Sequence, residues 1–149
     1  MDVLLPQGWA PAIGYANGVA AAPGRIVFVA GQVGWDEHQK FGSAELVPQF
    51  EQALKNVLAV LEEAGGRPEH ICRMTAYCCD KPAYLAARPE LGRIWRGLMG
   101  RHFPAMSMIF VADLLDHPAK IELEATAIVP ARRSTVRRKP AAKRRPRKR

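Results

Sequence analysis

Large hydrophobic residues recur at two spacings along the chain, one typical of helices and the other of strands. Between residues 43 and 64 they fall three or four positions apart, which gathers them on one stripe of a helix. The stripe consists of Phe50, Leu54, Val57, Leu58 and Leu61. Gly65 and Gly66 follow directly and predict the end of this helix.

A second helix is predicted between Asp80 and Gly100. Asp80 precedes Lys81 and Pro82, an order typical of a helix start, and Gly100 is expected to end the helix. Because proline cannot donate a backbone hydrogen bond, Pro89 is expected to interrupt and restart this helix. The apolar face consists of Leu91, Ile94, Trp95 and Leu98.

Alternation of apolar and polar residues predicts the strands. Residues 19–22 and 25–30 are separated by Pro23 and Gly24, which is typical of a hairpin. Further strands are predicted at residues 71–79, 105–112 and 120–129. Strands and helices in this order indicate an α+β domain of two layers, a mixed β-sheet packed on one side by two helices.

Two of these strands have faces of different character. In residues 120–129 the odd-numbered apolar side chains are predicted to point inward, and Glu122 and Glu124 share the opposite face. In residues 71–79, Arg73 lies on the polar face. The inner face of that strand is predicted to consist of Cys72, Met74, Ala76 and Cys78.

Charge is divided unevenly along the sequence. The chain has 149 residues, the size of one domain, and a formal net charge of +8. Residues 1–130 contain 11 basic and 14 acidic residues, a net charge of −3, whereas residues 131–149 contain 11 basic residues and no acidic ones. We therefore expect a folded domain over residues 1–130 and a disordered Lys/Arg-rich tail over residues 131–149.

The basic tail is typical of a segment that binds polyanions. It has no aromatic residue to stack on bases, so we expect it to bind nucleic acid without sequence preference. The alternative is a solvated extension without a dedicated partner. The residues expected to contact nucleic acid are Arg137, Arg138, Lys139, Lys143, Arg144, Arg145, Arg147, Lys148 and Arg149.

The sequence shows neither a membrane span nor a metal-binding motif. No apolar run reaches the roughly 18–20 residues of a membrane helix, and the N-terminus lacks a secretory pattern. Three cysteines cannot form a disulfide framework, so a cytoplasmic setting is expected. Neither a Cys-x-x-Cys pair nor two histidines four residues apart occurs, so no metal site is predicted.

Several short motifs occur in a fixed order between Ala10 and Pro130. They are AIGY (12–15), NGV (17–19), VFVAGQ (27–32), QALKNV (52–57), AGG (64–66), FPA (103–105) and KIELEATA (120–127). Their order and spacing resemble the RidA/YjgF family, whose members are also named endoribonuclease L-PSP. The resemblance implies a chorismate-mutase-like fold and a homotrimer with small-molecule sites in the clefts between subunits. It also implies hydrolytic deamination of enamines or imines without a cofactor.

Three positions depart from the pattern of the family's deaminases. Met106 follows the FPA motif where those members have an arginine that binds the substrate carboxylate. Ala30 replaces a serine, and Pro89 replaces a side-chain amide on the second helix. The resemblance therefore implies a substrate other than 2-aminoacrylate.

A replacement for the missing arginine has to come from elsewhere in the chain. Arg73 is the main candidate because it lies on the polar face of its strand; the alternative is a solvated surface side chain. The other candidates are Arg93 and Arg101. Met106 shares a strand face with Met108 and Phe110, and this face forms either the apolar floor of the ligand site or a contact between subunits.

The resemblance assigns the reaction to Glu122, Tyr15 and Gly31. Glu122 matches the acidic residue that positions the hydrolytic water and would act as a general acid/base; the alternative is a solvated carboxylate. Tyr15 would bind substrate through its hydroxyl, or it is an ordinary edge aromatic. Gly31 would offer backbone hydrogen bonds, and it also fits a tight turn or a close backbone approach.

Two functions follow from these residues. The first is a hydrolase that acts on the C–N bond of a reactive enamine or imine metabolite. The second is a non-catalytic protein that binds a small molecule, or nucleic acid through its basic tail. The absence of the arginine and of the hydroxyl favours the second.

Overall fold

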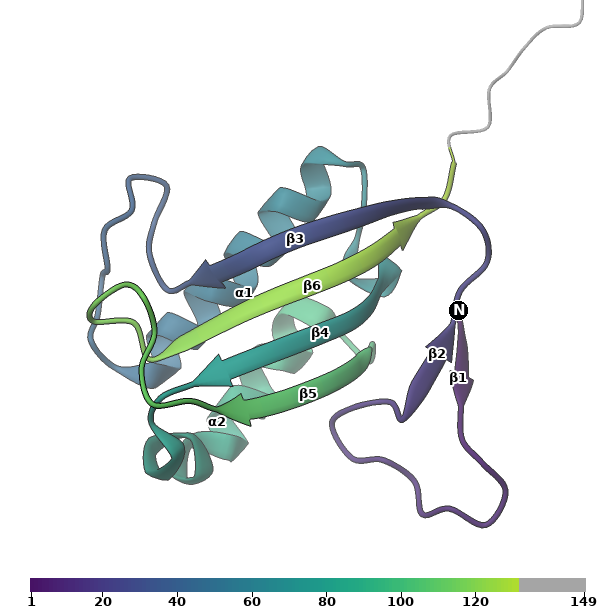
Figure 1. Cartoon of the computed structure of the whole chain (residues 1–149), viewed down its shortest axis with the longest axis horizontal. Helices are drawn as coiled ribbons and strands as arrows, with labels where there is room; N and C mark the ends of the chain where they lie inside the picture. Colours follow the sequence, from purple (N-terminus) through teal and green to yellow (C-terminus); the bar gives the residue numbers. More distant parts are fainter. Residues whose placement is uncertain (132–149) are drawn as a thin grey trace, which may run out of the picture.

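Four strands form one mixed sheet, and two helices cover one of its faces (Figure 1). This computed structural model describes residues 1–131. The elements are β3 (Arg25–Val33), α1 (Leu46–Glu63), the short 3-10 helix η1 (Pro68–His70), β4 (Ile71–Cys78), α2 (Lys81–Met99), β5 (Ala105–Phe110) and β6 (Ile121–Val129). The strand order is β3, β6, β4, β5; β4 and β5 are parallel and the other pairs antiparallel. The predicted α+β fold of two layers is confirmed.

The predicted apolar stripe of α1 is the part of this helix that packs on the sheet. Phe50, Leu54, Val57 and Leu61 are buried, whereas Leu58 is only partly buried. The helix ends where predicted because the chain turns back closely after it. A Cβ atom at Gly66 would lie 2.6 Å from Cγ of Leu61, so only glycine allows this return.

Helix α2 is continuous, so the prediction that Pro89 interrupts it is wrong. Pro89 lies inside the helix and is exposed. Proline has no N–H to donate to the carbonyl of Leu85, and both Leu85 and Pro89 are exposed on this side of the helix. The start of the helix is strongly fixed, because the Asp80 carboxylate accepts a hydrogen bond from the Ala83 N–H at 3.0 Å. Lys120 Nζ lies 2.9 Å from the other oxygen of Asp80.

The predicted hairpin of residues 19–22 and 25–30 does not form. Strand β2 (Gly18–Ala20) instead pairs with β1 (Asp2–Leu4), a strand that the sequence pattern did not reveal. Strand β3 pairs only with β6 and forms one edge of the sheet. It also runs past its predicted end to Val33, and its register shifts between Val29 and Gln32.

The inner face of β4 also differs from simple alternation. Its register with β6 shifts between Ile71 and Arg73, so Ile71 enters the core and Cys72 is only half-buried. Beyond this bulge Met74, Ala76 and Cys78 are fully buried as predicted.

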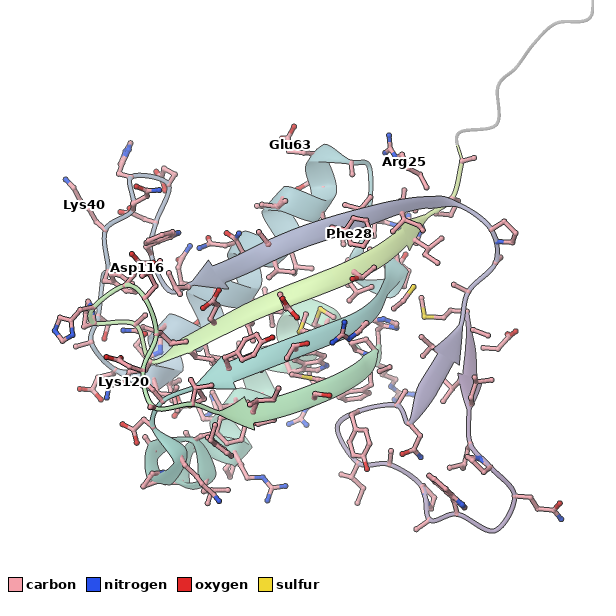
Figure 2. The ribbon with its side chains drawn as sticks, viewed as in Figure 1. Arg25, Phe28, Lys40, Glu63, Asp116 and Lys120 are labelled. Carbon is pink, nitrogen blue, oxygen red and sulfur yellow. The ribbon has the colours of Figure 1, made fainter. Side chains whose placement is uncertain are left out.

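The face of the sheet opposite the helices carries both charged and apolar side chains. Glu122 and Glu124 project from β6 on this open face and are half-buried. On β3, Phe28 is 77% exposed (Figure 2) and Ile26 is 56% exposed. The basic tail predicted for residues 131–149 lies, apart from Ala131, outside the described residues. No helix within residues 1–131 has the length and apolar character needed to cross a membrane.

Candidate functional site

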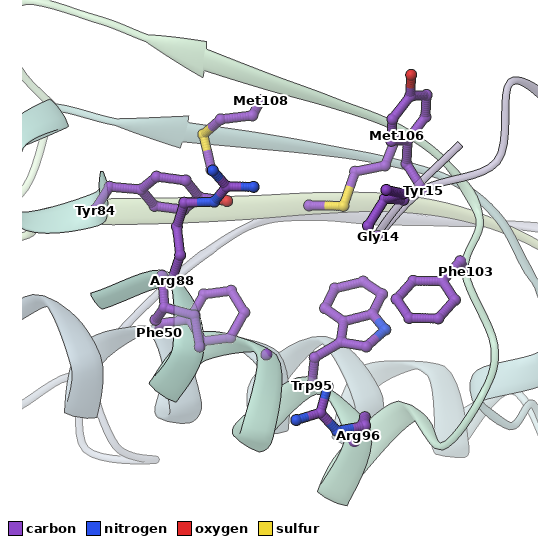
Figure 3. Close-up of a pocket in the computed structure, with 13 residues that line it drawn as sticks. Gly14, Tyr15, Phe50, Tyr84, Arg88, Trp95, Arg96, Phe103, Met106 and Met108 are labelled. Carbon is purple, nitrogen blue, oxygen red and sulfur yellow. The ribbon is translucent and has the colours of Figure 1, made fainter. Parts of the chain in front are cut away.

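A groove of about 520 Å³ lies between helix α2 and the outer strand β5 (Figure 3). Residues 13–15, in the loop that precedes β2, also line this groove. Volumes of this size are typical of small-molecule sites. The lining residues are Ile13, Gly14, Tyr15, Phe50, Tyr84, Arg88, Leu91, Gly92, Trp95, Arg96, Phe103, Met106 and Met108.

Backbone pairing holds Tyr15 at the mouth of this groove. The N–H of Ala16 donates to the carbonyl of Pro104 at 3.0 Å, and Ala16 pairs with Ala105 at the start of β5. Tyr15 and Met106, which the resemblance assigns to substrate binding, therefore both line this groove (Figure 3).

Met106 and Met108 form the wall of the groove on the sheet side. They stand opposite Met74 and Ala76 in the parallel register of β4 and β5, so they point toward the helices. The facing wall is aromatic: the rings of Trp95 and Phe103 stack, with centroids 5.9 Å apart and planes 7° apart. The indole N–H of Trp95 also donates to the carbonyl of His102 at 3.1 Å.

The cations of the groove are Arg88 and Arg96, which the sequence analysis did not select. Tyr84, Arg88, Leu91 and Trp95 follow one another at intervals of four, three and four residues on α2, one stripe of a continuous helix. The sequence did not predict this stripe, because the helix was expected to break at Pro89. The candidate Arg93 pairs with Glu90 at 3.7 Å and does not line the groove.

The predicted catalytic residue Glu122 lies against Gly31 on the open face of the sheet. A Cβ atom at Gly31 would lie 2.6 Å from the carboxyl carbon of Glu122 and closer still to its Oε1. The absence of a side chain at Gly31 thus provides the space that the carboxyl group occupies. Partial burial raises the pKa of Glu122, and the negative charges of Asp116 (Figure 2) and Glu124 raise it further.

Arg73 and Glu124 belong to a shallow hollow on the same open face. This hollow has a volume of about 390 Å³ and is also lined by Phe28 and Ala30. Arg73 Nη2 lies 3.4 Å from the hydroxyl of Thr75, and Tyr77 donates its phenolic hydrogen to Glu124 at 3.3 Å. Arg73 therefore does not stand beside Met106 in the same protomer, and Glu124 is engaged in a contact between strands.

Within one protomer the predicted site residues form two groups on opposite faces of the sheet. Tyr15 and Met106 line the groove on the helix side, and Gly31 and Glu122 meet on the open side. In residues 1–131 no group of three His, Cys, Asp or Glu side chains is placed to hold a metal ion.

A family model described as Endoribonuclease L-PSP matches residues 7–129. The chain belongs to the endoribonuclease L-PSP family. This confirms the family resemblance inferred from the motifs. Among the relatives of this L-PSP family protein is a RutC family protein of Pasteurella multocida, 30% identical over 70% of this chain and 81% of the relative. A RutC family protein of Haemophilus influenzae is 31% identical over 70% of this chain and 78% of the relative.

Solved structures of the same fold include the Rid family protein YyfB of Yersinia pestis, described as a protein of unknown function. It superposes with a TM-score of 0.76 at 32% identity and covers 86% of this chain and 98% of its own. E. coli TdcF, solved with bound serine, superposes with a TM-score of 0.61 at 26% identity and covers 87% of this chain and 99% of its own.

Proposed function

We propose that this L-PSP family protein is a hydrolytic deaminase of a reactive enamine or imine metabolite, with Glu122 as its catalytic acid/base. The observation that carries the proposal is the Glu122 carboxyl group lodged against the backbone of Gly31, with its pKa raised by burial and by two neighbouring carboxylates. A raised pKa brings a carboxyl group closer to neutral pH, where it can both accept and return a proton.

The chemistry needs a positioned water and a proton relay. Glu122 in its protonated form protonates the enamine at carbon, which gives an iminium ion, and water adds to the iminium carbon while one of its protons passes to the Glu122 carboxylate. Glu122 returns this proton to the nitrogen of the carbinolamine, and the C–N bond breaks as the remaining hydroxyl proton passes to the Glu122 carboxylate. Ammonia and a carbonyl product leave, and Glu122 is protonated again. Gly31 contributes backbone groups beside the reacting atoms, because no side chain shields them.

The proposed site combines residues of two subunits. Gly31 and Glu122 of one copy would face Tyr15 and Met106 of the next, since the two groups lie on opposite faces of the sheet in one protomer. The homotrimer implied by the family resemblance supplies such a contact. The exposed Phe28 and Ile26 support an interface on the open face. TdcF, a relative that binds serine, supports a small ligand related to amino acids.

The test compares Glu122→Gln with Glu124→Gln on imines generated in situ by oxidation of amines and amino acids. Glutamine cannot relay a proton, so Glu122→Gln is expected to lose about 10²–10⁴-fold in rate. Glu124→Gln is the matched comparison, because it makes the same change one step along the same strand face, where Glu124 accepts a hydrogen bond from Tyr77. It removes only the smallest of the contributions that raise the pKa of Glu122, so it is expected to lose little of the rate. Equal rates for the wild type and Glu122→Gln, with both proteins folded and of the same molecular mass, would contradict the proposal.

A second candidate function is binding of nucleic acid through the basic tail. The observation that favours it is the contrast between a net charge of −3 over residues 1–130 and 11 basic residues over 131–149. Fluorescence anisotropy with mixed-sequence RNA and DNA is expected to show salt-dependent binding by the full chain and none by residues 1–130. Binding that survives removal of residues 131–149 would place the contact on the folded domain and contradict this function for the tail.

A further inference from the structure

The groove between α2 and β5 has charge of one sign only. Arg88 and Arg96 are the charged residues among those that line it, and the rest are apolar or aromatic side chains, Tyr hydroxyls and glycine. No carboxylate within residues 1–131 forms an ion pair with either arginine. The next arginine on the helix, Arg93, is by contrast paired with Glu90. An apolar groove with unpaired cations is complementary to a ligand that carries both an apolar body and a negative charge.

Arg88 is the arginine placed to meet such a charge. Its guanidinium group is turned toward the sheet, on the side of the groove that Tyr84 and Met108 line (Figure 3). Arg96 lies at the helix side of the groove, with Trp95 between it and Met106 (Figure 3). The planar fork of a guanidinium group matches the two oxygens of a carboxylate.

The remaining walls suit a flat apolar body. Trp95 and Phe103 form a stacked aromatic surface, and the thioethers of Met106 and Met108 face it across the groove (Figure 3). Aromatic rings gain from offset or edge contacts with such surfaces, and methionine sulfur also makes favourable contacts with rings. The volume of about 520 Å³ exceeds the roughly 150 Å³ cavity that holds one benzene molecule.

We infer that this groove binds flat apolar carboxylates and that Arg88 holds the carboxylate group. Combined with the proposed function, on which this step rests, the inference identifies the substrates as imino acids with an aromatic or large apolar side chain. Arg88 thus supplies from the helix the cation that Met106 does not supply from the strand. It is a specificity-determining residue, and the reacting nitrogen stays on the side of Glu122.

The experiment measures binding by the full-length protein with cinnamate, cinnamamide and acetate as probes. Cinnamate has both the ring and the charge, cinnamamide has the ring alone, and acetate has the charge alone. Isothermal titration calorimetry at physiological salt compares the wild type with Arg88→Gln, Arg88→Lys and the control Arg93→Gln. The basic tail is present in every variant, so anion binding by the tail is the same throughout.

We expect cinnamate to bind the wild type and Arg93→Gln equally and Arg88→Gln about 10–100-fold more weakly, with partial rescue by Arg88→Lys. Cinnamamide should bind weakly and independently of Arg88, and acetate should bind more weakly than cinnamate. Unchanged cinnamate affinity in Arg88→Gln, equal affinity for cinnamate and cinnamamide, or no saturable binding of cinnamate would each overturn the inference. Because no turnover is measured, loss of deaminase activity in other assays does not affect this result.

Discussion

Replacement of Gly31 by alanine adds one methyl group at the point where the Glu122 carboxyl group meets the backbone. The carboxyl carbon would lie 2.6 Å from the new methyl and has to retreat by about 0.8 Å to reach 3.4 Å, the lower limit of ordinary van der Waals contact. Oε1 lies closer to the methyl and has to move farther. A misplacement of about 1 Å at a reacting group can cost about 10²-fold in rate, so we expect Gly31→Ala to lose about 10²-fold in kcat.

The stability of Gly31→Ala should change little, because the displaced atoms are the flexible end of a side chain. The matched control is Gly42→Ala, where a Cβ atom would meet nothing within 4 Å. The assay is kcat and KM for imine hydrolysis, with thermal unfolding measured in parallel. The same substitution is then made in Glu122→Gln, where it should cost almost nothing further because the proton relay is already absent.

Two results would refute the reasoning. Wild-type kcat in Gly31→Ala would show that the position of the Glu122 carboxyl group does not matter. An equal loss from Gly31→Ala in the wild type and in Glu122→Gln would show that Gly31 acts independently of Glu122.

Three further predictions follow from the two groups of site residues. The raised pKa of Glu122 means that the folded state binds its proton more tightly than the unfolded state, so stability falls as pH rises above the unfolded pKa. Glu122→Gln should therefore have a higher Tm than the wild type at about pH 8 and the same Tm below about pH 4; an equal Tm at both would contradict this. Met106→Arg should improve turnover of 2-aminoacrylate, because it adds a guanidinium group on β5; strong wild-type turnover of this small substrate would contradict the prediction. Residues 1–130 should form a homotrimer by light scattering, since Phe28 and Ile26 are exposed on the open face, and a monodisperse monomer at micromolar concentration would contradict it.

The sequence predicted the elements whose pattern is local. The stripe of α1 and the inward face of β6 appear in the structure as expected, because helical and strand periods decide which side chains meet the core. The prediction of a hairpin was wrong because β2 pairs with β1 near the N-terminus. The local sequence pattern of a strand does not identify which other strand it pairs with. The half-buried Cys72 was missed because a β-bulge leaves no signature in simple alternation.

The candidate site was predictable only as two separate halves. The family motifs pointed to Tyr15 and Met106 and to Gly31 and Glu122, but alternation within a strand does not reveal that β5 and β6 turn these residues to opposite faces. Arg88 was missed because Pro89 was expected to break the helix. Because α2 is continuous, Arg88 lies four residues after Tyr84 and seven before Trp95 on one helix, and this spacing places Arg88 on the side of the groove.

The most direct test of the proposed site between subunits is activity in mixed oligomers. Glu122→Gln lacks the proton relay, and Met106→Glu places a carboxylate in the groove where it competes with the substrate for the groove's arginines, so each variant alone should be inactive. The two are co-expressed in equal amounts with different tags, and total imine hydrolysis of the assembled protein is measured. In a closed ring each site takes Glu122 from one copy and the groove from the next, so about one quarter of the sites should be intact and about one quarter of wild-type activity should return. No recovery, in oligomers shown to contain both variants, would contradict a site shared between subunits.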